Sequence, residues 1–294
     1  MATAREWIEG ARPRTLGAAI APIAVGTGAA ATVGAVQPMR AGLALVVMLA
    51  AQVGANYAND YSDGIRGTDR ERVGPVRLVG QGLASPGHVK RAAIASLLVS
   101  AIAGLLLVAL TGQWWLLAVG GVALLAAWLY TGGPKPYGYL GLGEVFVFVF
   151  FGVVPVTGTA YVQALAVPAA AWVASLGVGA LICAVLVANN LRDIPTDAAV
   201  GKRTLAVRLG DRATRVGYVV LIVSAFAIIP PLALAGGLGL SFAWLGLVAA
   251  ILAVGPVRAV VRGAAGRDLV PVLQATGLLT LAYGMLLGLG LGLS

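Results

Sequence analysis

The sequence predicts an all-α protein, a polytopic membrane bundle of about nine transmembrane helices with the N-terminus in the cytoplasm and the C-terminus outside. Hydrophobic residues make up 60% of the 294 residues and charged residues only 11%, with a mean hydropathy of +0.94. Soluble domains are about a quarter charged, so this chain has too few charges to cover a water-facing surface of its length. Its apolar residues also gather in stretches of membrane-spanning length, and the Lys and Arg residues between them are unevenly distributed.

Nine apolar stretches follow one another, each close to the roughly 20 residues that cross a bilayer as a helix. They cover residues 15–36, 41–61, 92–111, 114–131, 142–163, 168–191, 216–235, 239–257 and 270–292. The first stretch lacks a small-residue cleavage site followed by a soluble domain, so we interpret it as a retained helix. We expect a single intramembrane domain over residues 1–294.

The connections support these boundaries in order along the chain. A tight polar turn, residues 111–113, separates the third stretch from the fourth, and a Gly- and Pro-rich turn, residues 130–137, separates the fourth from the fifth. The second and sixth stretches end in polar clusters. The last stretch carries a glycine-rich run, residues 288–292, which indicates close packing between helices.

The basic residues predict the orientation. All of the 20 Lys and Arg residues except Arg40 fall on the N-terminal tail and on the connections after the second, fourth, sixth and eighth stretches. Because Lys and Arg are retained on the cytoplasmic side, the N-terminus is predicted to lie in the cytoplasm. The same distribution accounts for most of the net charge of +9, so membrane lipid is an expected partner and nucleic acid is not.

Two polar clusters carry most of the chemistry. The first, residues 56–69, ends the second stretch, and a continued helix would place Asn56, Asp60 and Asp63 on one face. The second, residues 189–197, ends the sixth stretch with Asn189, Asp193 and Asp197 in helical spacing, although Pro195 in that cluster disfavours a continuous face. The candidate metal-binding residues are Asn56, Asn59, Asp60, Asp63, Asp69, Asp193 and Asp197, and the candidate catalytic residues are Asp60, Asp63, Asp193 and Asp197.

Carboxylates that face one another in a poorly hydrated bundle repel strongly unless cations lie between them. Carboxylate and amide oxygens are hard ligands that favour Mg²⁺ over Zn²⁺, and Mg²⁺ is commonly held by one or two carboxylates together with substrate phosphate oxygens. A bridged diphosphate is therefore the expected third component. The alternative is a pair of solvated helix ends with local caps.

Cations follow each cluster and could neutralise the remaining phosphate oxygens. Each of them could equally serve only to set the topology. The candidate diphosphate-binding residues are Arg66, Arg77, Lys135, Lys202 and Arg203.

These residues resemble the UbiA superfamily of intramembrane prenyltransferases, whose pattern is two Asp-rich motifs on the second and sixth of nine helices. Within it, several segments look like the branch that prenylates 1,4-dihydroxy-2-naphthoate. Gly67 stands where the general pattern has a third Asp, and the next acidic residue is Asp69. The segments that carry the resemblance are residues 11–16 (ARPRTL), 59–64 (NDYSDG), 74–77 (GPVR), 136–144 (PYGYLGLGE), 189–193 (NNLRD) and 201–205 (GKRTL).

The resemblance implies Mg²⁺-dependent transfer of a polyprenyl group from polyprenyl diphosphate to 1,4-dihydroxy-2-naphthoate, with loss of CO₂, giving demethylmenaquinone. It also implies a prokaryotic plasma membrane and an active site at its cytoplasmic side. Metal ions and cations would stabilise the departing diphosphate, and a water-poor interior would protect the cationic carbon. An aromatic wall would stabilise that carbon, with Tyr57, Tyr61, Tyr130 and Tyr139 as candidates. For each tyrosine the alternative is interfacial anchoring.

Three alternatives stay open from the sequence. The acceptor could be 4-hydroxybenzoate, homogentisate or haem, because the diphosphate machinery would be the same. The segment Asp60–Gly64 also resembles the opening of the CDP-alcohol phosphotransferase motif, but the second Asp pair here lies much further along the chain than that motif requires. A transporter would need isolated charges at mid-membrane, whereas these acids lie at helix ends.

Overall fold

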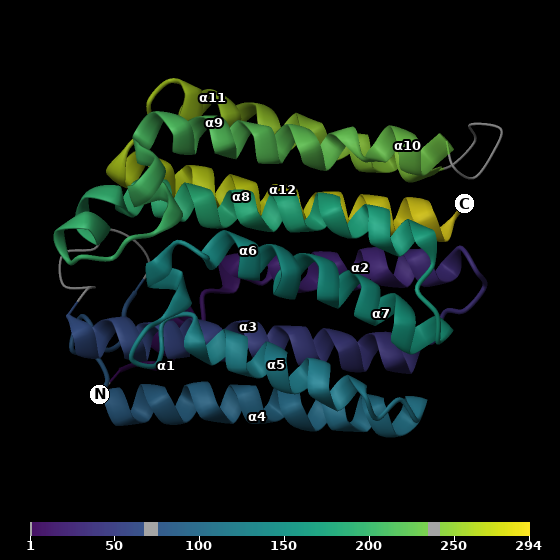
Figure 1. Ribbon diagram of the computed structural model, residues 1–294, viewed down its shortest axis with the longest axis horizontal. Coiled ribbons are helices and arrows are strands. Elements are labelled where there is room, and N and C mark those ends of the chain that lie inside the picture. The colour runs from purple at the N-terminus through teal and green to yellow at the C-terminus, as the bar shows by residue number, and fades with distance from the viewer. Residues whose placement is uncertain (1, 68–75, 235–241) are drawn as a thin grey trace.

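The computed structural model describes residues 2–67, 76–234 and 242–294, and every regular element in these ranges is a helix. The predicted all-α class is therefore confirmed. The long helices run side by side along the longest axis of the molecule, with α3 and α4 near one edge and α9 and α11 at the other (Figure 1). The two chain termini lie at opposite ends of that axis.

The helices follow the predicted stretches closely, but three stretches are divided: 142–163 among α6, η3 and α7, 216–235 between α9 and α10, and 239–257 between η4 and α11. The elements η1, η2, η4 and η5 are 3-10 helices, of which η4 has 12 residues, and η3 is a π-helix. The bounds are α1 (Ala4–Gly10), η1 (Pro13–Thr15), α2 (Gly17–Ala31), α3 (Pro38–Arg66), α4 (Pro86–Thr111), α5 (Leu116–Leu129), η2 (Tyr137–Leu140), α6 (Gly143–Val147), η3 (Phe148–Val153), α7 (Val154–Ala164), α8 (Ala169–Ala199), α9 (Leu205–Ala227), α10 (Ile229–Leu234), η4 (Phe242–Ala253), α11 (Val254–Val261), η5 (Gly266–Asp268) and α12 (Leu269–Gly292).

Seven helices in the described ranges are long and apolar enough to cross a membrane, so the chain is an integral membrane protein. Two further apolar helices, α2 with 15 residues and α5 with 14, are shorter than a full span. The nine-span count and the sides of the two termini therefore stay predictions. The predicted stretches 216–235 and 239–257 run into residues 235–241, which lie outside the described part of the chain.

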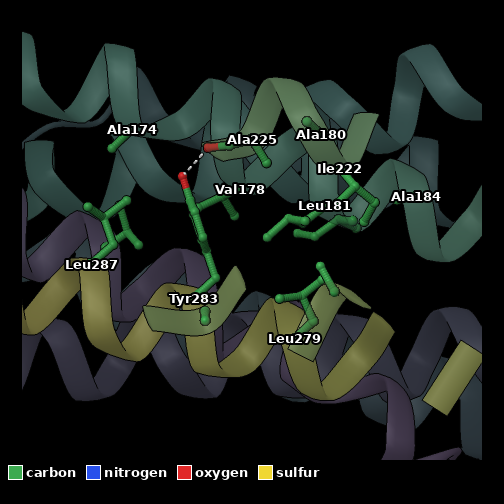
Figure 2. Close-up of a cluster of buried hydrophobic side chains, with 14 of the residues drawn as sticks. Ala174, Val178, Ala180, Leu181, Ala184, Ile222, Ala225, Leu279, Tyr283 and Leu287 are labelled. Carbon is green, nitrogen blue, oxygen red and sulfur yellow. Dashed lines mark hydrogen bonds between the residues drawn. The ribbon is translucent and has the colours of Figure 1, made fainter. Parts of the chain in front are cut away.

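Helix α8 forms the centre of the bundle and packs against α9, α12, η3 and α2. Val178 and Leu181 of α8 meet Leu279 and Tyr283 of α12 in the largest hydrophobic cluster, and the Tyr283 hydroxyl donates a hydrogen bond of 2.8 Å to the carbonyl of Ala225 in α9 (Figure 2). A buried tyrosine needs such a partner for its hydroxyl. The cluster and this hydrogen bond together join α8, α9 and α12.

Glycines bring α2 and α12 into close contact. A Cβ placed on Gly28 would come within 2.1 Å of the carbonyl oxygen of Gly288, and one on Gly284 within 2.4 Å of the Ala21 Cβ. Small residues let membrane helices approach at backbone distance, where packing replaces the hydrophobic effect as the source of stability. The glycine-rich end of the sequence is therefore a helix contact, as predicted.

Two local features determine how η3 and the end of α8 are arranged. The π-helix η3 separates α6 from α7, and its Gly152 lies against Gly179 of α8, where a Cβ would come within 2.4 Å of the Gly179 Cα. Helix α8 continues through Pro195 to Ala199, so the expected interruption of its polar face does not occur. Asp193 and Asp197 of the second cluster thus share one helical face.

Candidate active site

A cavity of about 500 Å³ opens among α3, α4, α5, η3 and α8. The C-terminal ends of α3 and α8, which carry the two polar clusters, lie at the same end of the molecule (Figure 1). Most of the cavity lining is apolar. The polar and charged residues that line it are Arg12, Thr15, Gln52, Asn56, Asn59, Asp63, Arg77, Ser100, Tyr130, Thr131, Tyr137, Asn189, Asn190 and Lys202.

Three members of the first cluster line the cavity. Asn56 donates from Nδ2 to the carbonyl of Ala11 at 2.9 Å, which attaches the N-terminal segment to α3. Asn59 Oδ1 accepts a hydrogen bond of 2.8 Å from the Thr131 hydroxyl, and Asp63 Oδ1 accepts one of 2.7 Å from the Tyr139 hydroxyl. The helix that carries the cluster persists to Arg66, so the predicted shared face does form.

Asp60 has different surroundings. Its Oδ2 accepts the backbone N–H of Leu78 at 2.7 Å and its Oδ1 accepts that of Val79 at 3.0 Å. The residue is 1% exposed and does not line the cavity. The Asp60 carboxylate therefore anchors the backbone at Leu78 and Val79. The neighbouring Arg77 is buried and lines the cavity.

The carboxylates of the second cluster form ion pairs with basic side chains that are close to them in the sequence. Arg192 donates from Nε to Asp193 Oδ1 at 2.7 Å and from Nη2 to Oδ2 at 2.8 Å, and Nη2 also reaches Asn189 Oδ1 at 2.9 Å. Lys202 Nζ lies 3.4 Å from Asp197 Oδ1. Buried carboxylates need such compensation, because an isolated buried charge is costly.

The predicted cations divide into two groups. Arg77 and Lys202 line the cavity, and Lys202 lies 5.1 Å from the centre of the Tyr139 ring. Arg66 instead donates to the carbonyls of Thr131 and Gly133 and so ties the end of α3 to the loop before η2. The other two, Lys135 and Arg203, are exposed and lie outside the cavity lining.

The four predicted tyrosines also divide. Tyr130 lines the cavity, and Tyr139 reaches it through its hydrogen bond to Asp63. Tyr57 donates its hydroxyl to the Trp7 carbonyl at 2.8 Å, and Tyr61 packs against Trp128 with ring centres 6.4 Å apart. Neither Tyr57 nor Tyr61 lines the cavity, so an interfacial or structural role suits them better.

A row of four aromatic rings in contact runs along the cavity, and only Tyr130 among them was predicted. Tyr130 meets Tyr137 at 5.5 Å between ring centres, Tyr137 stacks on Phe146 at 4.0 Å, and Phe146 stacks on Phe150 at 5.9 Å. All four rings line the cavity. Burial raises the pKa of Tyr137, which stays a neutral phenol and donates to the Ala126 carbonyl at 2.7 Å. The i, i+4 spacing of Phe146 and Phe150 is the sequence signal that could have identified the row.

Arg12 was also not predicted as part of the site. It lines the cavity in a left-handed backbone conformation, with φ of +56°, which is uncommon outside glycine. Its Nε and Nη2 atoms are buried and make no hydrogen bond within the described part of the chain. Strained residues and unpaired buried donors concentrate at functional sites, so Arg12 is an added candidate for binding a substrate anion.

No group of three or more His, Cys, Asp or Glu side chains forms a ready-made metal site within residues 2–67, 76–234 and 242–294. Of the predicted ligands in these ranges, Asn56, Asn59 and Asp63 at the end of α3 line the cavity, whereas Asp60, Asp193 and Asp197 do not. Asp69, the remaining predicted ligand, lies outside the described ranges.

An apolar cavity inside a helical membrane bundle, with carboxylates, amides and cations at one end, defines an intramembrane enzyme for substrates that join a polar group to a hydrocarbon. The chain belongs to the UbiA prenyltransferase family, whose model matches residues 19–278. This confirms the resemblance seen in the sequence and sets aside the phosphotransferase and transporter alternatives. The protein is a prenyltransferase.

Two relatives with assigned activities are similar over nearly the whole chain. The 1,4-dihydroxy-2-naphthoate octaprenyltransferase of Mycobacterium tuberculosis is 54% identical over 288 residues, which cover 97% of this chain and 96% of that protein. The enzyme of the same name from Escherichia coli is 38% identical over 294 residues, which cover 98% and 95%.

Solved structures share the fold at low sequence identity. A UbiA homolog from Aeropyrum pernix K1 aligns with a TM-score of 0.70 and 17% identity over 93% of this chain and 96% of that one. A UbiA homolog from Archaeoglobus fulgidus, bound to GPP and Mg²⁺, aligns with a TM-score of 0.63 and 15% identity over 96% and 99%. The bundle is thus the UbiA fold.

Proposed function

We propose that this protein transfers a polyprenyl group from polyprenyl diphosphate to 1,4-dihydroxy-2-naphthoate, with Mg²⁺ as cofactor and loss of CO₂. The product is demethylmenaquinone in its reduced quinol form. The observation that carries the proposal is the 54% identity, over nearly the full length of both chains, to the M. tuberculosis naphthoate octaprenyltransferase. The cavity supports it, because its charged end and its apolar aromatic wall match the two ends of a polyprenyl diphosphate.

The apolar part of the cavity suits the hydrocarbon chain. Leu105 of α4 and Leu117 of α5 line the cavity and are also exposed on the outside of the bundle, where lipid would surround it. A chain as apolar as lipid gains little by full enclosure, so an opening beside these helices would let it extend into the bilayer. The reacting end would then lie near the aromatic row.

The ligand set suits Mg²⁺ held jointly with a substrate. Asn59, Asp63, Asp193 and Asp197 supply amide and carboxylate oxygens, and Mg²⁺ is commonly bound through one or two carboxylates plus phosphate oxygens. A site divided between α3 and α8 therefore needs a diphosphate to complete it. When bound, the metal neutralises charge that develops on the departing diphosphate. The A. fulgidus homolog bound to GPP and Mg²⁺ supports this for the family.

The residues of this chain bind and orient the substrates. Arg77 and Lys202 contact phosphate oxygens, so that the allylic C–O bond breaks with its electron pair leaving on diphosphate. The row from Tyr130 to Phe150 faces the positive charge that develops on the allylic carbon and keeps water away from it. A carbon of the electron-rich naphthoate ring then forms the new C–C bond, and the carboxylate leaves as CO₂.

A direct assay tests the proposal. The purified protein in detergent is incubated with octaprenyl diphosphate, Mg²⁺ and either 1,4-dihydroxy-2-naphthoate or 4-hydroxybenzoate, and prenylated products are followed by mass. We expect product from the naphthoate alone, lighter by CO₂ than the simple adduct, and its loss on addition of EDTA. Product from 4-hydroxybenzoate alone would contradict the acceptor, and product that persists in EDTA would contradict the metal requirement.

We place the active site at the cytoplasmic side of a prokaryotic plasma membrane. The support is the distribution of Lys and Arg, which favours the loops at the ends of α3 and α8 over the opposite end of the bundle. The water-soluble diphosphate product would then leave on the side where its precursors are made.

A further inference from the structure

Glu144, at the start of α6, is a half-buried residue whose carboxyl group the proposed reaction does not use. Its Oε1 accepts a hydrogen bond of 2.9 Å from Nδ2 of Asn190 in α8, and its Oε2 is buried without a hydrogen-bond partner in the described part of the chain. The Cys183 thiol donates to the backbone carbonyl of the same glutamate at 3.2 Å. Both contacts are with α8, but only the one with Asn190 involves the Glu144 carboxyl group.

Glu144 and Asn190 line two different cavities. Asn190 lines the substrate cavity and is 5% exposed. Glu144 does not line this cavity. It lines a second, apolar cavity of about 460 Å³, whose lining comes from α6, η3, α8 and α9. Of the two α8 residues that Glu144 contacts, Asn190 is the one that lines the substrate cavity.

The hydrogen bond decides which atom Asn190 offers to a substrate. An amide has one end that only donates and one end that only accepts. Because Nδ2 donates to Glu144 Oε1, the amide is held with Nδ2 toward α6, and Oδ1 is the one acceptor atom that its side chain can offer to the substrate cavity. This orientation holds whether the carboxyl is ionised or carries its proton on Oε2, since Oε1 accepts in both cases.

The position of Asn190 indicates which substrate it meets. It lies one helical turn before Asp193 on α8, and its neighbours in the lining include Leu186 and Phe146. This is the boundary between the charged end and the apolar part of the cavity, where the two reacting carbons would meet. A fully ionised diphosphate has no hydrogen to donate, whereas the aromatic acceptor carries hydroxyl groups on its ring.

We propose that Glu144 is a positioning residue that holds Asn190 with Oδ1 toward the cavity, where it accepts a hydrogen bond from a ring hydroxyl of the aromatic acceptor. This rests on the proposed function. The hydrogen bond orients the ring and increases its electron density as it attacks the allylic carbon. It also selects for hydroxylated acceptors, because a ring without that hydroxyl would leave a buried acceptor atom unpaired.

Three variants test the inference. Glu144→Leu removes the acceptor, and we expect the KM for the naphthoate to rise about tenfold or more, with the KM for octaprenyl diphosphate and the Mg²⁺ requirement unchanged. Glu144→Gln retains an oxygen that can accept from Asn190, so it should restore most of the affinity. Cys183→Ala is the matched control, because it removes the other contact with Glu144 and leaves its carboxyl in place; its kinetics should be those of the unmodified protein.

Methyl ethers of the acceptor provide a test that does not depend on the stability of one variant. In the unmodified protein, one of the two mono-O-methyl ethers of the naphthoate should be used with a KM about tenfold above that of the parent compound. In Asn190→Leu and in Glu144→Leu, the parent compound and that ether should have similar KM values. The unchanged KM for octaprenyl diphosphate in each variant establishes that the protein is folded.

Two results would overturn the inference. One is an ether penalty of the same size in the unmodified protein and in Asn190→Leu. The other is a changed Mg²⁺ requirement in Glu144→Leu with an unchanged KM for the acceptor, which would make Asn190 a metal ligand. Turnover of the naphthoate by the unmodified protein tests the proposed function separately, before any variant is compared.

Discussion

At the scale of single residues, the carboxylates near the cavity each have a partner of a different kind. Asp63 accepts from the Tyr139 hydroxyl, Asp193 forms a two-point ion pair with Arg192, and Asp197 lies beside Lys202. Buried charges paired in this way keep their orientation without a bound ligand. The partners, as much as the carboxylates, therefore define the geometry that a substrate meets.

Asp193→Asn should lower kcat by at least about 100-fold, because it removes a candidate metal ligand and also leaves the Arg192 charge buried without its partner. The measurement is single-turnover formation of prenylated naphthoate by the purified variant. Asp211→Asn is the matched control, since Asp211 also pairs with an arginine, Arg215, but its side chain is 60% exposed. The site assignment would fail if both variants turned over at the rate of the unmodified protein.

Asp60→Asn should act through Arg77. An asparagine can accept only one of the two backbone N–H groups that Asp60 now accepts, so the segment that carries Arg77 would loosen. We expect the KM for octaprenyl diphosphate to rise about tenfold and the midpoint of thermal unfolding to fall. A raised Mg²⁺ requirement with an unchanged KM would instead support the role as a metal ligand that the sequence predicted.

At the scale of elements, the sequence predicted which segments are helical but not how each one is used. The apolar stretches and the polar ends of α3 and α8 were correct, because hydrophobicity and helical spacing are local properties. The position of the Asp60 carboxylate could not be predicted, because its partners lie in a segment with no pattern of its own. Continuity through Pro195 depends on the packing of α8, which overrides the local preference.

Gly28→Ala should destabilise the protein, although alanine normally stabilises a helix relative to glycine by about 1 kcal/mol. The new Cβ would lie 2.1 Å from the carbonyl oxygen of Gly288, so α2 and α12 must separate. We expect a loss of about 1–3 kcal/mol, measured as a lower midpoint of thermal unfolding in detergent. Gly42→Ala is the control, since no atom lies within 4 Å of its added Cβ. Equal midpoints for the two variants would contradict the close contact.

At the scale of the whole molecule, the charge distribution and the arrangement of helices agree. The polar ends of α3 and α8 lie at the end of the bundle that holds the N-terminus, and the C-terminus lies at the other end (Figure 1). Composition alone predicted a membrane bundle, since too few charges were present for any other surface. The cavity could not be predicted, because it depends on how α5 and η3 pack against α3 and α8.

Labelling of single cysteines in intact cells tests the orientation. Cys183→Ala provides a background without thiols, because Cys183 is the only cysteine. Lys135→Cys, in an exposed loop predicted to be cytoplasmic, should react with a membrane-impermeant thiol reagent only after the cells are opened. Val33→Cys, 58% exposed after α2, should react in intact cells. The reverse pattern would invert the topology.

The contact between α2 and α12 joins segments near the two ends of the chain. Contacts of such long sequence separation form late, since most of the polypeptide must be present before they can close. During synthesis, α2 therefore enters the bilayer long before its glycine face has a partner. That face is covered only after α12 has been synthesised and inserted, so α12 is the helix that completes this contact.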